Sequence, residues 1–110
     1  MKLVLVPLTT EALRRLDLDE SLPGDIVELE LSDEDYALIS KSGVLDKINS
    51  SLGKMLDEYE DESIQGRSSL SASLTIFNEA YNATRHDVIS RIISMNELAI
   101  ENDTGMFFYL

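Results

Sequence analysis

The chain has 110 residues, close to the commonest domain size, and 44% of them are apolar, which is enough to form a core and argues against disorder. With 21 acidic and nine basic residues the net charge is −12, which disfavours binding to nucleic acid or anionic membranes. The absence of cysteine excludes disulfides, thiolate metal sites and cysteine nucleophiles.

Two strands are predicted in the N-terminal third of the chain. Residues 2–6 form an aliphatic run that Pro7 closes, and such a continuous run is typical of a strand covered on both faces, as in parallel sheets. Residues 25–31 alternate in their latter half, with aliphatic side chains on one face and Glu28 and Glu30 on the other. The linker between the two strands is long enough for a crossover, so a parallel pair is possible.

Helices are expected between and after these strands. Thr9 or Thr10 can cap a short first helix, and Ser32, followed by three acids, is a clear cap for a second. An apolar stripe from Leu45 to Tyr59 predicts one longer helix, in which Gly53 lowers helix stability without breaking the pattern. The predicted helices cover residues 11–16, 33–42, 45–59 and 69–102, the last of these as one helix or two.

The C-terminal residues 106–110 form a third apolar segment after a turn, and we expect it to dock as a strand because so apolar an end is unfavourable in solvent. Residues 64–69 are predicted to form a loop. The sequence therefore predicts a single domain over residues 1–110, of class α+β (or α/β). Its small three-stranded sheet, made of the two N-terminal strands and the C-terminal strand, packs against four to five helices.

Acidic residues gather in the N-terminal part of the chain. Between Arg15 and Lys41 there are nine acids and no base, and a second block of acids spans residues 57–62. Acidic runs are usually solvated surfaces, but surfaces built only for solubility tend to mix both signs of charge. The sequence thus predicts a docking surface for a basic partner. The candidate partner-binding residues are Asp17, Asp19, Glu20, Asp25, Glu28, Glu30, Asp33, Glu34, Asp57, Glu58, Tyr59, Glu60 and Asp61.

Tyr59 has two interpretations. Within the second acidic block it could anchor a binding patch, whereas its register with Leu52 and Met55 favours the core. We favour a buried ring with the hydroxyl group at the surface.

No catalytic or metal-binding motif is evident. Residues 17–28 place oxygen ligands at calcium-loop spacing, but Leu22 stands where the sharp turn requires glycine. The single histidine, His86, lies beside Asp87 and is more simply an exposed polar residue at a helix start. We expect no enzyme activity, no cofactor and no metal. A carboxylate-only metal site is a third hypothesis, which a titration with magnesium or manganese would test.

The chain also has no apolar run of the about 20 residues that a membrane-spanning helix needs, and no basic segment preceding an apolar signal core. Together with the lack of cysteine, this favours a cytoplasmic location.

In length, acidity and lack of catalytic groups, the chain resembles the small immunity proteins of bacterial toxin–immunity systems, such as those of contact-dependent growth inhibition. The resemblance is carried by the acidic stretch from Asp17 to Asp35 and by the block from Asp57 to Glu62. It implies a cytosolic protein that neutralises a cognate toxin, often a basic nuclease domain. The alternative is a small regulatory or adaptor protein that binds a host protein through a helical face. In this alternative the protein can also be a homodimer.

Overall fold

The structure, a computed structural model, describes residues 1–110 as a four-stranded antiparallel sheet with five helices. The sheet has the order β2-β1-β4-β3. In chain order the elements are β1 (Lys2–Pro7), α1 (Thr10–Asp17), β2 (Ile26–Leu31), α2 (Asp33–Ser42), α3 (Val44–Leu52), β3 (Asp61–Gln65), α4 (Arg67–Thr84), α5 (Asp87–Asn102) and β4 (Gly105–Tyr109).

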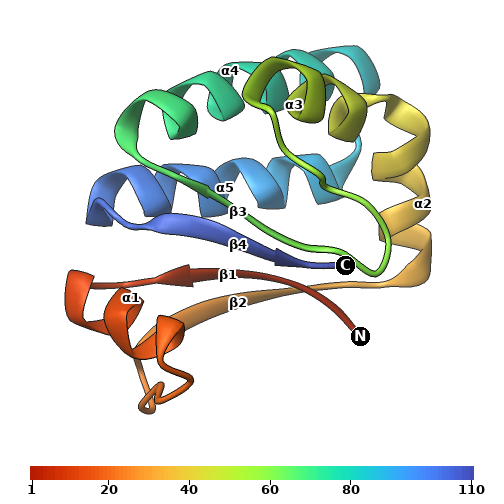
Figure 1. Ribbon diagram of the computed structural model, residues 1–110. Helices are drawn as coiled ribbons and strands as arrows, with labels where there is room; N and C mark the ends of the chain where they lie inside the picture. The colour runs from red at the N-terminus through yellow and green to blue at the C-terminus, as the bar shows by residue number, and fades with distance from the viewer.

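Helices α2 to α5 cover one face of the sheet, whereas α1 lies on the opposite side, next to the end of β1 and the start of β2 (Figure 1). The main core lies under the larger helical layer, where Val4, Val6, Met106 and Phe108 of the two central strands meet α3, α4 and α5. On the other face, Leu5, Ala12 and Phe107 are buried but stand outside this core. The face covered by α2 to α5 is called the helix face below, and the opposite face is called the outer face.

The α+β class was predicted, but the three-stranded sheet was wrong because β3 adds a fourth strand. This strand pairs antiparallel with β4 from Asp61↔Tyr109 to Gln65↔Gly105. Only Ile64 within it is apolar and buried, so the alternation that identifies strands is missing from its sequence. The docked C-terminal strand was predicted correctly: β4 lies between β1 and β3.

The parallel arrangement of the first two strands was also wrong, because β1 and β2 pair antiparallel over six consecutive residue pairs. The aliphatic run of β1 reflects a central strand covered on both faces, by α5 on one side and α1 on the other (Figure 1). Coverage of both faces, rather than strand direction, is what makes such a run apolar.

The predicted helix over residues 45–59 ends early. Gly53 adopts the left-handed conformation with φ of 64° and terminates α3 at Leu52. Leu56 is still buried (2% exposed), but it reaches the core from the following loop, where Asn49 holds its backbone through two hydrogen bonds of 2.7 and 3.1 Å. The predicted burial of the Tyr59 ring is wrong, since this side chain is 89% exposed.

The local signals at helix ends were more reliable. The Thr9 hydroxyl accepts a hydrogen bond from the N–H of Ala12 (2.9 Å) at the start of α1. Ser32 and Asp35 form a reciprocal capping box at the start of α2. The segment 69–102 forms two helices, because Arg85 takes the left-handed conformation after α4 and His86 is the non-helical N-cap residue of α5.

A buried polar pair fixes α4 against α5. Asn96, fully buried, donates a hydrogen bond to the carbonyl of Leu70 (2.9 Å), and its side-chain oxygen lies 2.7 Å from the hydroxyl of Ser73.

We expect Asn96→Ala to lower the free energy of unfolding by about 2 kcal/mol, because it leaves buried polar groups without partners. Urea denaturation measures this change, with the exposed Asn82→Ala as the control, expected to stay within about 0.5 kcal/mol of wild type. Equal effects of the two substitutions would contradict this role for Asn96.

Candidate acidic docking surface

The acidic side chains differ in whether a base neutralises them. Of the 21 acidic residues, eight lie within 4.0 Å of a lysine or arginine nitrogen, and the other thirteen have no such partner. The unpaired carboxylates are the groups available to a partner, because their charge is not already offset within the molecule.

Five unpaired carboxylates surround the uncovered part of the outer face. Glu28 and Glu30 stand on β2, and Asp61 stands on β3 at the opposite edge. Asp17 ends α1, and Asp19 follows it in the next loop. These five residues, Asp17, Asp19, Glu28, Glu30 and Asp61, are called the acidic outer face below.

The register of the sheet explains this arrangement. Glu30 lies opposite Leu3 of β1, Leu3 lies opposite Tyr109 of β4, and Tyr109 lies opposite Asp61 of β3. The row therefore has a carboxylate at each end and an apolar and an aromatic residue in the middle, both partly exposed. With neighbouring strands roughly 4.8 Å apart, three spacings separate the backbones of Glu30 and Asp61 by roughly 14 Å.

Tyr109 reports on the local field. Burial raises the pKa of its hydroxyl, and the negative charges of Asp61, Asp17 and Asp19 raise it further. Carboxylates from α1, the loop after it and β3 thus converge on one phenol from three parts of the chain. Two exposed leucines of that loop, Leu18 and Leu22, add apolar surface beside them.

Asp25 was predicted to bind a partner but is buried inside the molecule, with 8% of its surface exposed. Both of its carboxylate oxygens accept hydrogen bonds from the Arg15 guanidinium, at 2.7 and 2.8 Å, and the Leu22 N–H donates a further one at 2.8 Å. This arrangement fastens α1 and its loop to the start of β2. Asp25 therefore lies outside the acidic outer face.

The calcium-loop hypothesis fails at the same residue, because the oxygens that a cation would need are already occupied by Arg15 and Leu22. Across the molecule, no three acidic or histidine side chains converge in a way that could hold a metal ion.

The remaining predicted residues lie at the end of the sheet where β2 stops and β3 starts. Asp33 and Glu58 bind the ammonium of Lys2, at 3.7 and 3.1 Å, and this ammonium lies 5.1 Å from the centre of the Tyr36 ring. The hydrogen bond with Glu58 raises the pKa of Lys2. The other predicted residues here are exposed without a basic partner, namely Glu34, Asp57, Tyr59 and Glu60, as is Glu20 in the loop after α1.

Tyr59 adopts the left-handed conformation, with φ of 67°, in the loop that leads to β3. It lines an open groove of about 540 Å³ together with Lys2, Tyr36 and Glu58. Its ring therefore extends into solvent next to the acidic block, so Tyr59 is a surface residue and not a core residue.

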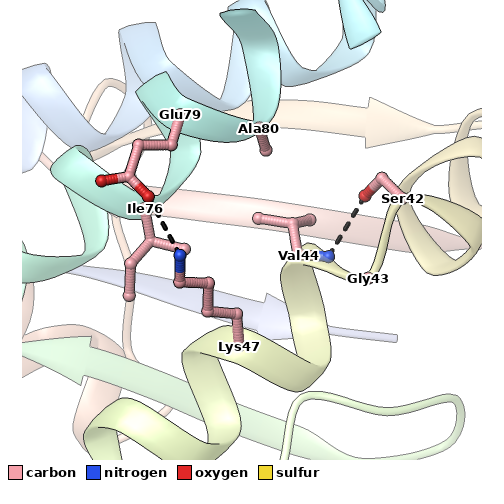
Figure 2. A pocket seen from close by; sticks show the side chains of 7 residues that line it. All are labelled: Ser42, Gly43, Val44, Lys47, Ile76, Glu79 and Ala80. Carbon is pink, nitrogen blue, oxygen red and sulfur yellow. Dashed lines mark hydrogen bonds and ion pairs between the residues drawn. The ribbon is translucent and has the colours of Figure 1, made fainter. Parts of the chain in front are cut away.

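A second, smaller depression lies between α3 and α4, with a volume of about 180 Å³ (Figure 2). Lys47 of α3 reaches across it to Glu79 of α4, at 3.0 Å, and the Ser42 hydroxyl accepts a hydrogen bond from the Val44 N–H, at 3.2 Å (Figure 2). This volume is below the roughly 300 Å³ of a small ligand site, and its polar groups already bind one another. It offers no arrangement of a nucleophile with a base.

The single histidine is also not part of an arrangement of a nucleophile with a base. His86 is the N-cap residue of α5, and its ring makes no hydrogen bond with Asp87, which instead accepts one from Arg91 at 3.1 Å.

None of the five helices is long and apolar enough to cross a membrane.

The fold defines an α+β protein in which a helical layer covers one face of an antiparallel sheet. The solved structure of the Neisseria DNA mimic protein DMP12 has this fold, with a TM-score of 0.67, 17% sequence identity and coverage of 100% of both chains. At this identity, the similarity establishes the fold alone. No protein-family model and no curated protein sequence matches the chain.

The buried ion pair leads to a prediction about stability. The Arg15 guanidinium, helped by the Leu22 N–H, holds the pKa of Asp25 at about 2, below its usual value of 3.8. Because the lowered pKa favours the ionised folded state, this stabilisation is complete above pH about 4 and is lost as the pH falls towards about 2. We expect Asp25→Asn to lower Tm at pH 7 by roughly 5 °C or more, since it leaves Arg15 without its partner.

Thermal denaturation followed by circular dichroism measures this effect. The difference in Tm between wild type and variant should shrink as the pH falls below 4. A constant difference down to pH 2 would contradict the assigned pKa.

A further prediction concerns the field at Tyr109. The triple variant Asp17→Asn/Asp19→Asn/Asp61→Asn should lower the pKa of Tyr109 without returning it to the ordinary value, because burial still raises it. Ultraviolet absorbance of tyrosinate measures the titration, and Tyr109→Phe identifies the phase that belongs to this residue. An unchanged pKa in the triple variant would show that these carboxylates do not converge on the phenol.

Proposed function

We propose that this protein binds the basic surface of a nucleic-acid-binding protein and occupies that surface in place of nucleic acid. The observation that carries the proposal is the acidic outer face: five carboxylates without a basic partner border the partly exposed Leu3 and Tyr109. Apolar residues at the centre of a charged rim are typical of protein interfaces. The unpaired charges would speed association with a basic partner.

The spacing of the charges supports mimicry of nucleic acid. The two edges of the acidic outer face lie roughly 14 Å apart, similar to the major groove of B-DNA, about 12 Å wide between its phosphate backbones. Glu28 and Glu30 follow one another along β2 at about 6.6 Å, close to the step between phosphates on one strand. Lysines and arginines placed to bind phosphates would therefore meet carboxylates at comparable positions.

The name of the Neisseria protein, a DNA mimic protein, describes the same type of role for that protein. Extending this role to the present chain is part of our proposal. The finer form of the proposal is that the partner is the nuclease domain of a cognate toxin, as the resemblance to immunity proteins implies. No catalytic role is assigned to any residue.

The direct test uses a basic nuclease domain, the class of partner that the proposal names, with a labelled DNA duplex bound to it. We expect the wild-type protein to displace the duplex, and the affinity for the partner to fall with rising salt. The variant Glu28→Gln/Glu30→Gln/Asp61→Asn should bind the partner about tenfold or more weakly, because several favourable charge pairs are lost. Fluorescence anisotropy of the duplex measures the displacement.

The matched control is Asp46→Asn/Glu97→Gln/Glu101→Gln. It removes the same number of exposed, unpaired charges, but from α3 and α5. The control should bind like wild type. If the control weakens binding and the outer-face variant does not, the protein acts through its helical face, as the adaptor hypothesis states. Affinity that does not depend on salt would rule out the electrostatic part of the proposal.

A further inference from the structure

Strand β2 forms an open edge of the sheet. Its six residues pair in unbroken register with β1, without a bulge and without proline. The backbone groups of Ile26–Leu31 make no hydrogen bond other than those to β1. Because alternate backbone groups of a strand point away from its neighbour, a row of N–H and C=O groups along β2 is free to pair with another strand.

The opposite edge is protected in a way that β2 is not. On β3, Glu62 shares the helix face with the buried Ile64, and its carboxylate binds the Met55 N–H at 3.1 Å and the Lys54 ammonium at 4.0 Å. An inward-pointing charge of this kind discourages an incoming strand. On β2 the residues that point to the helix face are aliphatic. Val27 and Leu29 pack against the core but remain partly exposed to solvent.

The side chains of β2 specify what such a strand would carry. Glu28 and Glu30 are exposed, unpaired and on the same face of the strand. A strand added antiparallel to β2 places a residue opposite each of them, with Cβ atoms about 5 Å apart. Lysine or arginine at every second position would pair with both glutamates, and small or aliphatic residues between them would lie beside Val27 and Leu29.

The same geometry argues against a second copy of this chain. Two β2 strands paired antiparallel would bring the glutamates of one copy against those of the other, and like charges directly opposite are unfavourable. The protein's net charge of −12 adds to this repulsion. A basic segment is therefore the occupant that fits the edge.

We infer that β2 is a docking edge for an extended segment of the partner in which basic residues alternate with neutral ones. Backbone hydrogen bonds supply affinity, and Glu28 and Glu30 select the basic residues. This inference rests on the proposed function, because it assumes a basic protein partner, and it specifies which element of the protein that partner contacts.

The experiment uses a capped synthetic peptide, Lys-Thr-Lys-Val-Lys-Thr-Lys, as the probe. Its control is the same peptide with N-methyl groups on two adjacent central residues, which block one N–H on each edge of the peptide and leave the charge unchanged. We expect the unmodified peptide to bind at least about tenfold more tightly, since the methylated one cannot complete the strand pairing. Isothermal titration at low salt measures both affinities.

Two further measurements locate the site. Hydrogen exchange should show slower exchange of amides within residues 26–31 when the peptide is bound. Glu28→Gln/Glu30→Gln should weaken binding of the peptide, whereas the matched control Glu97→Gln/Glu101→Gln on α5 should not.

Equal affinity of the two peptides, or unchanged exchange in β2, would overturn the inference, as would the absence of any binding at low salt. The proposed function is decided separately by displacement of DNA, which could succeed through side chains of the acidic outer face alone. A dimer that forms through β2 in sedimentation experiments would also overturn the inference, because the occupant would then be a second copy.

Discussion

The insertion of β4 between β1 and β3 is the interaction on which the rest of the structure depends. It joins the two ends of the chain in one sheet and supplies Met106 and Phe108 to the core. On the outer face it sets Tyr109 between Leu3 and Asp61. Thr104, just before the strand, fixes its start by donating a hydrogen bond to the carbonyl of Pro7 at 2.7 Å. Without this pairing, β3 would have no neighbouring strand, and Asp61 would not lie at the edge of the sheet.

The parts of the fold that could be predicted from the sequence are those with local physical causes. An aliphatic run identifies β1, alternation identifies β2 and an apolar, aromatic segment identifies β4, and the hydroxyl caps at Thr9 and Ser32 mark helix starts. The errors arose where tertiary contacts decide. Strand β3 exists because β4 offers it a paired edge. Leu56 is buried as its apolar character predicts, but from a loop and not from a helix, because α3 ends at Leu52 and Asn49 holds the backbone of Leu56.

The candidate site follows the same division. The outward direction of Glu28 and Glu30 follows from alternation alone, because side chains on a strand point to opposite faces. The pairing of Asp25 with Arg15 joins the end of one helix to the start of a strand, and a list of acidic residues does not reveal it. The exposed position of Tyr59 depends on the termination of α3 at Gly53, since a longer helix would have turned its ring inward.

Thirteen carboxylates without basic partners also determine how the isolated protein responds to dissolved ions. Their mutual repulsion opposes folding, and salt screens it over a length of roughly 10 Å at 0.1 M. Higher ionic strength is therefore expected to have opposite effects on the stability of the isolated protein and on its affinity for a basic partner. Added salt should make the free protein more resistant to heat, and it should weaken the proposed binding to a cationic partner.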